Sequence, residues 1–555
     1  MGITEIFTKK NIEILGLLSN ESLHMRDIAA RLDISPAKVH STIQLFRKNN
    51  LVKENKEKNR IIISLNKESL LLKEIQNLLN IGNKDTSSVS AVSGINIFDA
   101  ISPLDFRYYA RNEKIFQKLQ PYLSENAMIR HMAKVEAALT NTLAKKGICS
   151  KKIAEEVEKA CKKVTAEEVY LEEDKLRHNV RALVNCIRNK VSDEAKPYVH
   201  FTATSHDIIA TADALRYKEF TNNALLPLLV EFEKTLISLS LREKNTMQVG
   251  RTHGQHAVPI TFGFAIAQYV SRFGNSIMKI KKSGNNLRGK IAGAVGSYNA
   301  SSLFFDDPEK FEREVLAEIN LKASPISTQI PGHEYMVSYI NAIMESFGVL
   351  ANLADDMRHL QRSEIAEVAE VFGEKQVGSS TMPQKRNPIN FENVKSLWKA
   401  FMPRMITLYE DQISEHQRDL TNSASSRFVP EILAAFYIAV SRLNKTMKSL
   451  VVDKENIRKN FEMNKGLIAA EPLYILLAAR GHPDAHEAVR QLTLKSQQQR
   501  IPLQNMIKKE KSLEPFLRKF TKKQKEIISN PEKYTGIASK KAESVCNYWK
   551  KELKI

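Results

Sequence analysis

The fold of this chain is decided by the stretch Gly378-Ser379-Ser380-Thr381-Met382-Pro383-Gln384-Lys385-Arg386-Asn387-Pro388. It separates two segments of helical pattern, 335–372 and 390–409, and its glycine and prolines disfavour helix, so we predict a loop. Two adjacent hydroxyls, an amide and two cations suit an anionic ligand, and a loop hinged on glycine can close over one. A plain polar surface loop is the usual meaning of a lone Gly-Ser-Ser, but it does not account for the complete string.

The complete string resembles the signature loop of the fumarase/aspartase superfamily, whose members eliminate fumarate from succinyl compounds. The resemblance implies a mainly α subunit, with three domains built around a long-helix bundle. It also implies a homotetramer in which each active site combines segments from three subunits. No metal or organic cofactor is implied, because the elimination needs only proton transfers and fixed charges.

Composition fits an intracellular enzyme. The chain has 555 residues, enough for several domains, and no apolar run approaches the roughly 20 residues that span a bilayer. Its first ten residues lack the apolar core of a signal peptide. The four cysteines are widely spaced and form no Cys-x-x-Cys pair, which argues against a disulfide framework and a four-thiolate zinc site. We therefore expect a cytoplasmic protein that does not cross a membrane.

The formal net charge is +20, an excess that attracts nucleic acids and polyanionic metabolites. The lysines, however, are scattered through the predicted helices and the C-terminal region instead of forming one basic arm. A solvated basic surface accounts for most of them, so the charge alone does not identify a partner.

Residues 1–82 form a separate pattern, with three short amphipathic helices followed by a hairpin of 51–54 with 61–65. Ser35 is a plausible N-cap of the third helix and Pro36 fits its first position. This order resembles a winged helix-turn-helix, in which the exposed face of the third helix enters the major groove of DNA. Protein contact or dimerisation is the alternative role, since fold does not fix function. The candidate DNA-binding residues are Lys38, His40, Ser41, Gln44 and Lys48.

The rest of the chain is organised as a helical body. From Asn112 onward almost every segment has a helical pattern, and the longest patterns are 165–189, 205–246, 260–282, 335–372 and 390–409. Pro227 is expected to kink the second of these. The predicted divisions are the winged helix-turn-helix module 1–82, a linker 83–96, a first lyase domain 97–198, the central bundle 199–450 and a C-terminal helical domain 451–555.

Three segments upstream of the loop resemble substrate-binding segments of adenylosuccinate lyases. Arg107-Tyr108 opens the body, where an Arg-Tyr pair contacts the nucleotide phosphate in that family. Arg177-His178-Asn179-Val180 stands where Arg-His-Asp-Val is usual, so Asn179 removes a carboxylate next to the imidazole. Thr204-Ser205 resembles a pair that binds substrate at a helix start, although such hydroxyls are also ordinary caps. The residues carried over here are Arg107, Tyr108, Arg177, His178, Asn179, Thr204 and Ser205.

Two further segments complete the resemblance. In Gly250-Arg251-Thr252-His253-Gly254-Gln255-His256-Ala257, no carboxylate or cysteine completes a metal set with the histidines. The family pattern makes His253 the acid that protonates the leaving nitrogen, whereas His256 is interpreted as structural. Arg418, Ser423 and Arg427 keep the family's spacing of nucleotide contacts, and Gln329 falls where the family has a substrate-binding glutamine.

The implied reaction is the elimination of fumarate from adenylosuccinate, giving AMP, and from the succinylated aminoimidazole carboxamide ribotide of purine synthesis. By resemblance Ser379 is the base, and a serine can act so only if its alkoxide is stabilised. Lys385 and the N–H groups of the loop are candidates for that role. Ser380, Lys385 and Asn387 are predicted to hold the substrate.

Two alternatives stay open at this point. Argininosuccinate lyase has a loop of the same Met-Pro-Gln-Lys type, but Arg386-Asn387, Arg107-Tyr108 and the Arg-His-x-Val segment favour the purine enzyme. The other alternative is a DNA-binding regulator whose lyase body only senses a purine metabolite. The presence of both predicted catalytic residues, His253 and Ser379, argues against it.

Overall fold

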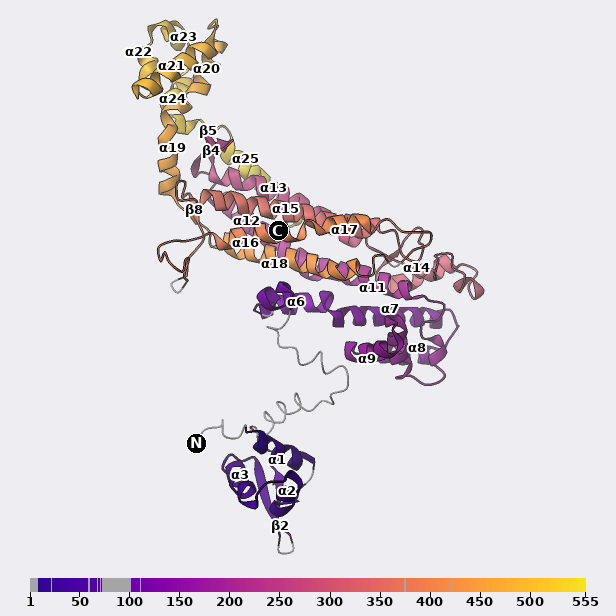
Figure 1. Cartoon of the computed structure of the whole chain (residues 1–555). Coiled ribbons are helices and arrows are strands. Elements are labelled where there is room, and N and C mark those ends of the chain that lie inside the picture. The colour runs from indigo at the N-terminus through magenta and orange to yellow at the C-terminus, as the bar shows by residue number, and fades with distance from the viewer. Residues whose placement is uncertain are drawn as a thin grey trace. The chain divides into compact units, whose positions relative to one another are not determined.

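The computed structural model describes residues 8–20, 22–57, 60–66, 68–69, 71, 101–109, 111–373, 376–419 and 421–555. The chain divides into two compact units, 1–96 and 97–555, which we describe separately (Figure 1). The predicted linker 83–96 lies outside the described residues. The finer division of the second unit into three domains stays a prediction.

The elements described between residues 8 and 66 of the first unit are three helices and a small antiparallel sheet. They are α1 (Lys9–Asn20), β1 (Leu23–His24), α2 (Met25–Leu32), α3 (Pro36–Lys48), β2 (Val52–Glu57) and β3 (Arg60–Leu65). Ser35 caps α3 as predicted: its hydroxyl accepts a hydrogen bond from the N–H of Lys38 at 3.3 Å, and Pro36 is the first helical residue. The predicted hairpin is present as β2 and β3. Strand β1 is an addition that the pattern did not predict, giving the order β1-β3-β2.

The second unit is centred on a bundle of long helices. These are α11 (Ser205–Phe220), α12 (Leu226–Arg242), α13 (Phe262–Asn285), α15 (Glu334–Leu360), α16 (Ile389–Phe401) and α18 (Val429–Lys448). Helix α13 packs against α12 and α15, and α16 packs against α15 and α18. Their apolar side chains belong to one continuous buried cluster. The mainly helical fold class predicted from the sequence is therefore confirmed.

Helices α11 and α12 form one continuous helix, joined by the π-helical turn η5 (Thr221–Leu225). Pro227 follows this turn closely. Because proline has no N–H, it interrupts the regular i to i−4 bonding, and a π-helical turn is a common way to accommodate the interruption. At 1.5 Å per residue, the helix from Ser205 to Arg242 is roughly 55 Å long. It therefore places the residues before α11 far from those after α12.

Further helical elements pack around the bundle. They are η3 (Leu104–Tyr109), α6 (Glu113–Leu123), α7 (Glu125–Lys145), α8 (Lys151–Cys161), α9 (Ala166–Leu176), α10 (Asn179–Arg188), η4 (Lys196–Tyr198), η6 (Ser301–Leu303), α14 (Pro308–Glu318), α17 (Arg404–Glu410) and η7 (Ser425–Phe428). Helix α7 packs on α11 and α8, and α9 packs on α10. This packing fixes the start of α10 close to the start of α11.

The C-terminal helices form a smaller cluster with an apolar core of its own. They are α19 (Lys454–Ile468), α20 (Ala470–Ala479), α21 (Ala485–Gln499), α22 (Leu503–Lys509), η8 (Lys511–Leu513), α23 (Glu514–Leu517), α24 (Lys522–Ser529), η9 (Pro531–Lys533) and α25 (Ala538–Leu553). The last helix, α25, returns to the bundle and packs against α13 and α12. The contact is close, since a Cβ on Gly274 of α13 would lie 2.4 Å from the ring of Trp549.

The second unit also contains three two-stranded pairings that join distant segments. Strands β4 (Met247–Thr252) and β5 (Gln255–Thr261) form an antiparallel hairpin between α12 and α13. Strand β6 (Arg288–Gly289) runs parallel to β7 (Lys322–Ala323). Strand β8 (Val368–Ala369) is antiparallel to β9 (Val451–Val452).

Three helix predictions were too long. The pattern 335–372 ends as a helix at Leu360, where the C-cap Gln361 keeps right-handed backbone angles and donates its N–H to the carbonyl oxygens of Met357 and His359. The pattern 390–409 is divided into α16 and α17, and Pro403 stands directly before α17. The pattern 165–189 is divided into α9 and α10 at Arg177, which has φ 56°. The Arg177-His178-Asn179 segment consequently lies at a junction between two helices.

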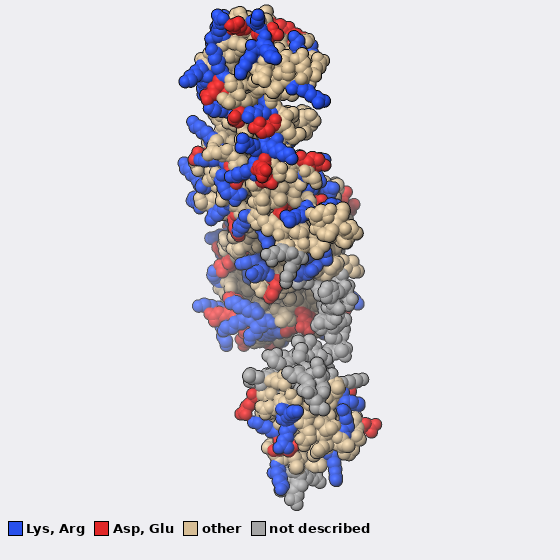
Figure 2. All heavy atoms as spheres, turned by 90° about the vertical axis from the view of Figure 1, so that its left-hand side faces the viewer, with Lys and Arg blue, Asp and Glu red and all other residues tan. Residues whose placement is uncertain are grey.

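The surface carries the basic excess in a dispersed form. Figure 2 shows Lys and Arg side chains spread over the visible face of each unit, with Asp and Glu between them. Many lysines form ion pairs along their own helices, such as Lys162 with Glu158 at 2.6 Å. Among the described residues, no helix is both long enough and apolar enough to cross a membrane.

Candidate active site

His253, the predicted general acid, stands at the tip of the β4–β5 hairpin. Thr252 pairs with Gln255, so His253 and Gly254 form a two-residue turn. Their φ angles are 54° and 74°, as a type I′ turn requires at both positions. His253 is exposed in the single chain, and the hairpin presents its imidazole beyond the end of the bundle.

A buried carboxylate anchors this hairpin. Glu367 is fully buried and accepts hydrogen bonds from Gln248 Nε2 at 2.6 Å, Arg251 Nη2 at 2.6 Å and Asn460 Nδ2 at 3.0 Å. Three donors on one carboxylate tie β4 and α19 to the segment that leads into the signature loop. Because Glu367 precedes that loop by only about ten residues, it sets the hairpin and the loop at the same end of the bundle.

His256, on the same hairpin, is held differently. Its Nδ1 lies 3.0 Å from Asn464 Nδ2, which is a donor, so this ring nitrogen accepts. Burial, followed by the nearby Arg251 guanidinium, lowers the pKa of His256. These contacts agree with its interpretation as a structural residue.

The signature loop is closed at its base. The Asn387 amide donates to the carbonyl oxygen of Gly378 at 2.9 Å. A Cβ on Gly378 would lie 2.0 Å from the carbonyl oxygen of Lys385, so only glycine allows this approach. Within the loop, the Ser379 hydroxyl oxygen accepts from the N–H groups of Thr381 at 3.3 Å and Met382 at 3.1 Å. Two N–H donors on this oxygen are the kind of contact that stabilises a serine alkoxide.

The other predicted binding residues of the loop face solvent in different degrees. Ser380 and Lys385 are exposed, whereas Asn387 is half-buried and already donates its amide within the loop. Glu370, before the loop, accepts from the N–H groups of Asn390 and Phe391, each at 2.9 Å, and so caps the start of α16. Burial raises the pKa of the Glu370 carboxyl, although these hydrogen bonds oppose the change.

Arg107 and Tyr108 reach the same region from η3. The Tyr108 hydroxyl accepts a hydrogen bond from Asn393 Nδ2 at 2.9 Å, so η3 lies beside the first turns of α16. Arg107 is exposed. The structure thus brings this predicted phosphate-binding pair near the helix that follows the signature loop.

A second group of predicted residues gathers at the start of α11. Thr204 is the N-cap of α11 and Ser205 its first residue. His178, the N-cap of α10, accepts from the N–H of Arg181 through Nδ1 at 3.2 Å and places Nε2 at 3.5 Å from the Ser205 hydroxyl. Asn179 accepts the neighbouring Val180 N–H at 2.7 Å, so its side chain acts within its own helix start.

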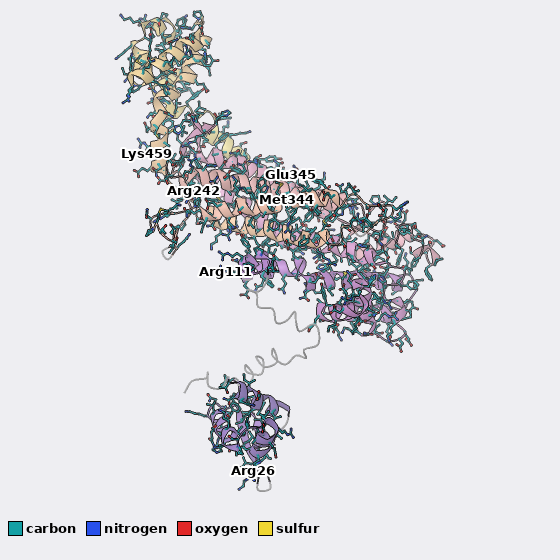
Figure 3. All side chains as sticks on the ribbon, viewed as in Figure 1. Arg26, Arg111, Arg242, Met344, Glu345 and Lys459 are labelled. Carbon is teal, nitrogen blue, oxygen red and sulfur yellow. The ribbon has the colours of Figure 1, made fainter. Side chains whose placement is uncertain are left out.

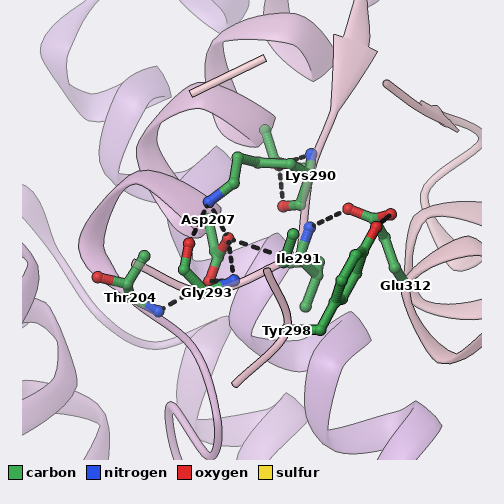
Figure 4. A network of polar contacts seen from close by, with 9 residues as sticks. Thr204, Asp207, Lys290, Ile291, Gly293, Tyr298 and Glu312 are labelled. Atoms are coloured by element: carbon green, nitrogen blue, oxygen red, sulfur yellow. Dashed lines mark hydrogen bonds and ion pairs between the residues drawn. The ribbon is translucent and has the colours of Figure 1, made fainter. Parts of the chain in front are cut away.

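Behind Thr204 and Ser205 lies a network that the sequence did not predict (Figure 4). The Asp207 carboxylate accepts from Lys290 Nζ at 2.5 Å and from the N–H groups of Thr204, Ala292 and Gly293 at 2.9, 3.1 and 3.2 Å. The side chains of Asp207 and Lys290 are both 0% exposed. Two fully buried charged groups are stable only where each has an opposite charge and hydrogen-bond partners.

Gln329 and Arg418 also meet in this region. The N–H of Gln329 donates to the carbonyl oxygen of Gln417 at 3.0 Å, and Arg418 Nη1 donates to Asp411 O at 3.2 Å. Arg418 Nε and Nη2 are buried, and neither finds a hydrogen-bond partner in the part of the chain that the structure describes. Burial first, and then the charges of Lys290 and Arg418, lower the pKa of His206. Arg418 thus adds positive charge and two free donor nitrogens to this region, which suit an anion.

Ser423 and Arg427 lie farther along the same segment, around the 3₁₀ turn η7, and both are exposed. No group of three or more His, Cys, Asp and Glu side chains among the described residues is arranged to hold a metal ion.

The predicted site residues thus form two groups at opposite ends of the bundle. The hairpin-end group comprises His253, Ser379, Ser380, Lys385 and Asn387, and the α11-start group comprises Arg177, His178, Asn179, Thr204, Ser205, Gln329 and Arg418. The α11–α12 helix separates them by roughly 55 Å, and Figure 1 shows β4 and β5 at the end opposite to α11 and α14. In Figure 3, Arg242 and Lys459 mark the hairpin end and Glu345 marks the middle of α15. One chain does not bring the two groups together.

Sequence reasoning missed the buried residues that support both groups. Glu367 and Lys290 stand in no distinctive local motif, and their side-chain partners lie 80 or more residues away. Asp207 does stand in a local motif, the capping box with Thr204, but that motif gives no sign of the bond to Lys290. Sequence reasoning also missed the hairpin, although His253-Gly254 between two alternating segments is a usable signal for a two-residue turn.

Comparisons with known proteins agree with the resemblance. The family model described as "Lyase" matches residues 106–400, and that described as "Adenylosuccinate lyase C-terminal" matches residues 414–534. The adenylosuccinate lyase of Archaeoglobus fulgidus is 34% identical over 459 residues, which are 82% of this chain and 100% of the relative. That of Pyrococcus abyssi is 34% identical over 456 residues, 81% of this chain and 98% of the relative.

Among solved structures, the 3-carboxy-cis,cis-muconate lactonizing enzyme of Pseudomonas putida matches with a TM-score of 0.70 at 22% identity. The match covers 81% of this chain and 99% of that one. At this identity the likeness concerns the fold alone.

Proposed function

The chain belongs to the adenylosuccinate lyase family of the fumarase/aspartase superfamily, and on this basis we propose that it eliminates fumarate from adenylosuccinate to give AMP. The same site would cleave the succinylated aminoimidazole carboxamide ribotide, because the two substrates share the succinyl group on an amine nitrogen. The reaction removes a proton beside a carboxylate and breaks the adjacent carbon–nitrogen bond.

The observation that carries this proposal is the environment of Ser379. Its hydroxyl oxygen accepts two N–H groups of its own loop, at 3.3 and 3.1 Å, and such donors lower the cost of an alkoxide. The alkoxide takes the proton beside the succinyl carboxylate, whose developing charge is met by Lys385 when the loop closes. His253 gives a proton to the leaving nitrogen.

Substrate binding falls to residues at both ends of the bundle. Arg107 and Tyr108 offer a guanidinium and a phenol to the phosphate, and Arg418 offers two buried donor nitrogens. Thr204, Ser205 and Gln329 offer hydroxyls and an amide to the rest of the molecule. Ser423 and Arg427 stay family-based candidates for the nucleotide contact.

The separation of the two groups supports a shared site. A ligand as small as adenylosuccinate cannot bridge roughly 55 Å along one helix, so a complete site needs the hairpin end of one copy and the α11 start of another. A closed symmetric oligomer provides such pairings repeatedly. We take the homotetramer typical of the superfamily as the assembly of this chain.

A fumarate-release assay tests the function. Full-length protein is given adenylosuccinate and argininosuccinate side by side, and release from the former alone is expected. Release from argininosuccinate alone would assign the competing lyase activity, and binding of adenylosuccinate without release would assign a sensor.

For the first unit we propose a winged helix-turn-helix module. Its order of elements and the sheet order β1-β3-β2 support this assignment. A groove of about 650 Å³ runs along α3, lined by Thr8, Asn11, Lys38, Ser41, Thr42, Gln44, Leu45 and Lys48. Four of the five predicted DNA contacts (Lys38, Ser41, Gln44 and Lys48) share this face, while His40 is exposed beside it. A polar, basic helix face of this kind fits a nucleic-acid groove.

A further inference from the structure

The Asp207–Lys290 pair is more extensive than a helix cap requires. A capping box needs only a carboxylate at the third helical position that accepts the N-cap N–H, and Asp207 meets this need with Thr204. The same carboxylate also accepts Lys290 Nζ and two further N–H groups, of Ala292 and Gly293. Lys290 Nζ in turn donates to the carbonyl oxygen of Gly293 at 2.8 Å. The extra bonds join α11 to a separate loop.

That loop is held rigidly on its other side. Glu312 of α14 is 2% exposed and accepts from the N–H of Ile291 at 2.7 Å and from the Tyr298 hydroxyl at 2.7 Å. Gly293 has φ 80°, a conformation that favours glycine. Figure 4 shows Asp207 and Glu312 on opposite sides of the loop that carries Ile291 and Gly293. The loop is therefore clamped between two buried carboxylates.

The loop then touches the segment that carries Gln329. Gly296 has φ 82°, and a Cβ there would lie 1.9 Å from the carbonyl oxygen of Ser327. Two residues on, the N–H of Gln329 donates to Gln417, beside Arg418. Contiguous contacts thus run from Thr204 through Asp207, Lys290 and Gly296 to Gln329 and Arg418. Every step is made by backbone or by buried side chains.

We propose that the Asp207–Lys290 pair is a positioning device that sets the spacing between the Thr204–Ser205 and Gln329–Arg418 parts of the substrate site. This inference rests on the proposed function of that site. Neither charged group reaches the ligand, because both side chains are fully buried. The carboxylate, with four donors converging on it, fixes the loop more tightly than a neutral pair would.

The charge balance fits the same role. Asp207 neutralises Lys290, so the pair adds no net cation to the electropositive region around Arg418. Anion binding is thereby left to the residues that face the ligand, and the pair contributes geometry alone. Loss of this geometry should weaken substrate binding more than it slows the chemical step, since the predicted acid and base lie at the other end of the bundle.

The test compares four proteins: wild type, Asp207→Asn, Lys290→Met and the double variant. Each single change leaves one buried group unpaired and should lower Tm, whereas the double change removes both charges and should recover much of the loss. A positioning pair predicts that the double variant keeps a KM for adenylosuccinate raised about ten-fold or more, with kcat changed less than about three-fold. A merely structural pair predicts that KM recovers together with Tm.

Asp213→Asn is the matched control. Asp213 lies on the same helix and holds Arg216 Nε at 2.7 Å in another largely buried ion pair, outside the series of contacts described from Asp207 to Gln329. Its loss should lower Tm and leave KM within about two-fold. If the KM of Asp213→Asn rises as much as the KM of the double variant, the proposal is wrong.

Two further outcomes are distinguishable. If the double variant fails to regain stability, Asp207→Asn assayed at 15 °C, with folding verified by circular dichroism, supplies the same KM comparison. A near-wild-type KM in that sample overturns the proposal. If the wild-type protein releases no fumarate, the proposed function is wrong, and the proposed role of the Asp207–Lys290 pair is wrong as well.

Discussion

At the hairpin end the reactive side chains stand exposed on loops, whereas at the start of α11 the polar residues rest on a buried charged network. His253, Ser380 and Lys385 are exposed, and only the supporting Glu367 is fully buried. At α11, Thr204 and Ser205 lie directly over Asp207 and Lys290, which are both fully buried. The hairpin-end group therefore needs its loop to close over a ligand, whereas the α11-start group is already held in place without a ligand.

The comparison also explains why each end alone is insufficient. The hairpin end has an acid, a base and a cation but few fixed donors for a nucleotide. The α11 start has fixed donors, among them Arg418 with two buried unpartnered nitrogens, but no predicted catalytic residue. The hairpin end therefore supplies the catalytic residues and the α11 start supplies fixed binding donors. Variants of each end test this division of roles.

Ser379→Ala should have the largest effect. Removal of the proposed base should lower kcat by at least about 100-fold, in the range of lost proton-transfer catalysis. AMP binding, measured by calorimetry, should survive, because the nucleotide contacts come from other segments. A variant that keeps more than about a tenth of kcat, a loss under roughly 1.4 kcal/mol, would exclude Ser379 as the base.

His253→Ala should lower kcat by about 100-fold for adenylosuccinate, and less for a substrate with a better leaving nitrogen. His256→Ala is the matched control, since this residue lies on the same hairpin but accepts a hydrogen bond from Asn464. Steady-state rates of the control should fall much less than those of His253→Ala. Equal losses in both would mean that the hairpin as a whole, and not the His253 imidazole, is needed.

A mixing experiment tests whether the two ends act between copies. His253→Ala damages the hairpin end and His178→Ala the α11 start, so each homo-oligomer should be nearly inactive. Co-expressed chains that assemble at random should form intact sites at about a quarter of positions, because each site takes one end from each of two chains. Activity should rise accordingly in the fumarate assay. Hybrids no more active than their parents would place both ends of a site in one chain.

Most of the fold was predictable because its signals are local. The three short helices, the Ser35 cap and the hairpin of the first unit follow from amphipathic spacing and capping chemistry, and all are present. The helix end at Arg177 was missed, since it depends on a left-handed residue with an ordinary side chain. The end after Leu360 was missed because no glycine or proline marks it before Gly373. A β-hairpin inside a helical protein was missed because the segment was interpreted for its histidines and not for its alternation.

The site residues could be predicted from the sequence only where neighbouring residues form a recognisable motif. Ser379 and Thr204-Ser205 stand in short strings that can be recognised in isolation. Glu367, Asp207 and Lys290 cannot be recognised in this way, because a charged residue in a sequence is usually a solvated one. Only the fold shows that these three are buried and that each holds a functional segment in place.

Asn179→Asp should have a smaller effect, confined to the α11 start. Asn179 accepts the Val180 N–H, and its neighbour His178 contacts Arg181 and Ser205. A carboxylate here would add a negative charge beside the His178 imidazole, so the pH–rate profile should move to higher pH if Asn179 lies next to a group that titrates in the reaction. The profile of kcat/KM measures this. A profile unchanged in position would show that residue 179 does not couple to such a group.

Deletion of residues 1–96 should have the smallest effect on catalysis, because every residue proposed for the site lies at or beyond Arg107. We expect fumarate release within about two-fold of the full-length rate. Duplex DNA should bind the full-length protein with an affinity that falls steeply with salt, and should bind the truncated protein much more weakly. Several copies of α3 in one oligomer would strengthen this difference.

The double variant Lys38→Ala/Lys48→Ala tests DNA binding by the first unit more directly. Both residues line the groove along α3, and neither belongs to the buried core of the unit. Lys53→Ala is the matched control, because that lysine lies on β2 and forms an exposed ion pair with Glu68 at 2.9 Å. A DNA-binding module predicts weaker binding and a shallower salt slope in the double variant alone. An assembly module predicts instead that truncation changes the oligomer seen by light scattering while DNA binding stays equally weak in every protein. That second pattern would remove the nucleic-acid proposal and leave the catalytic one intact.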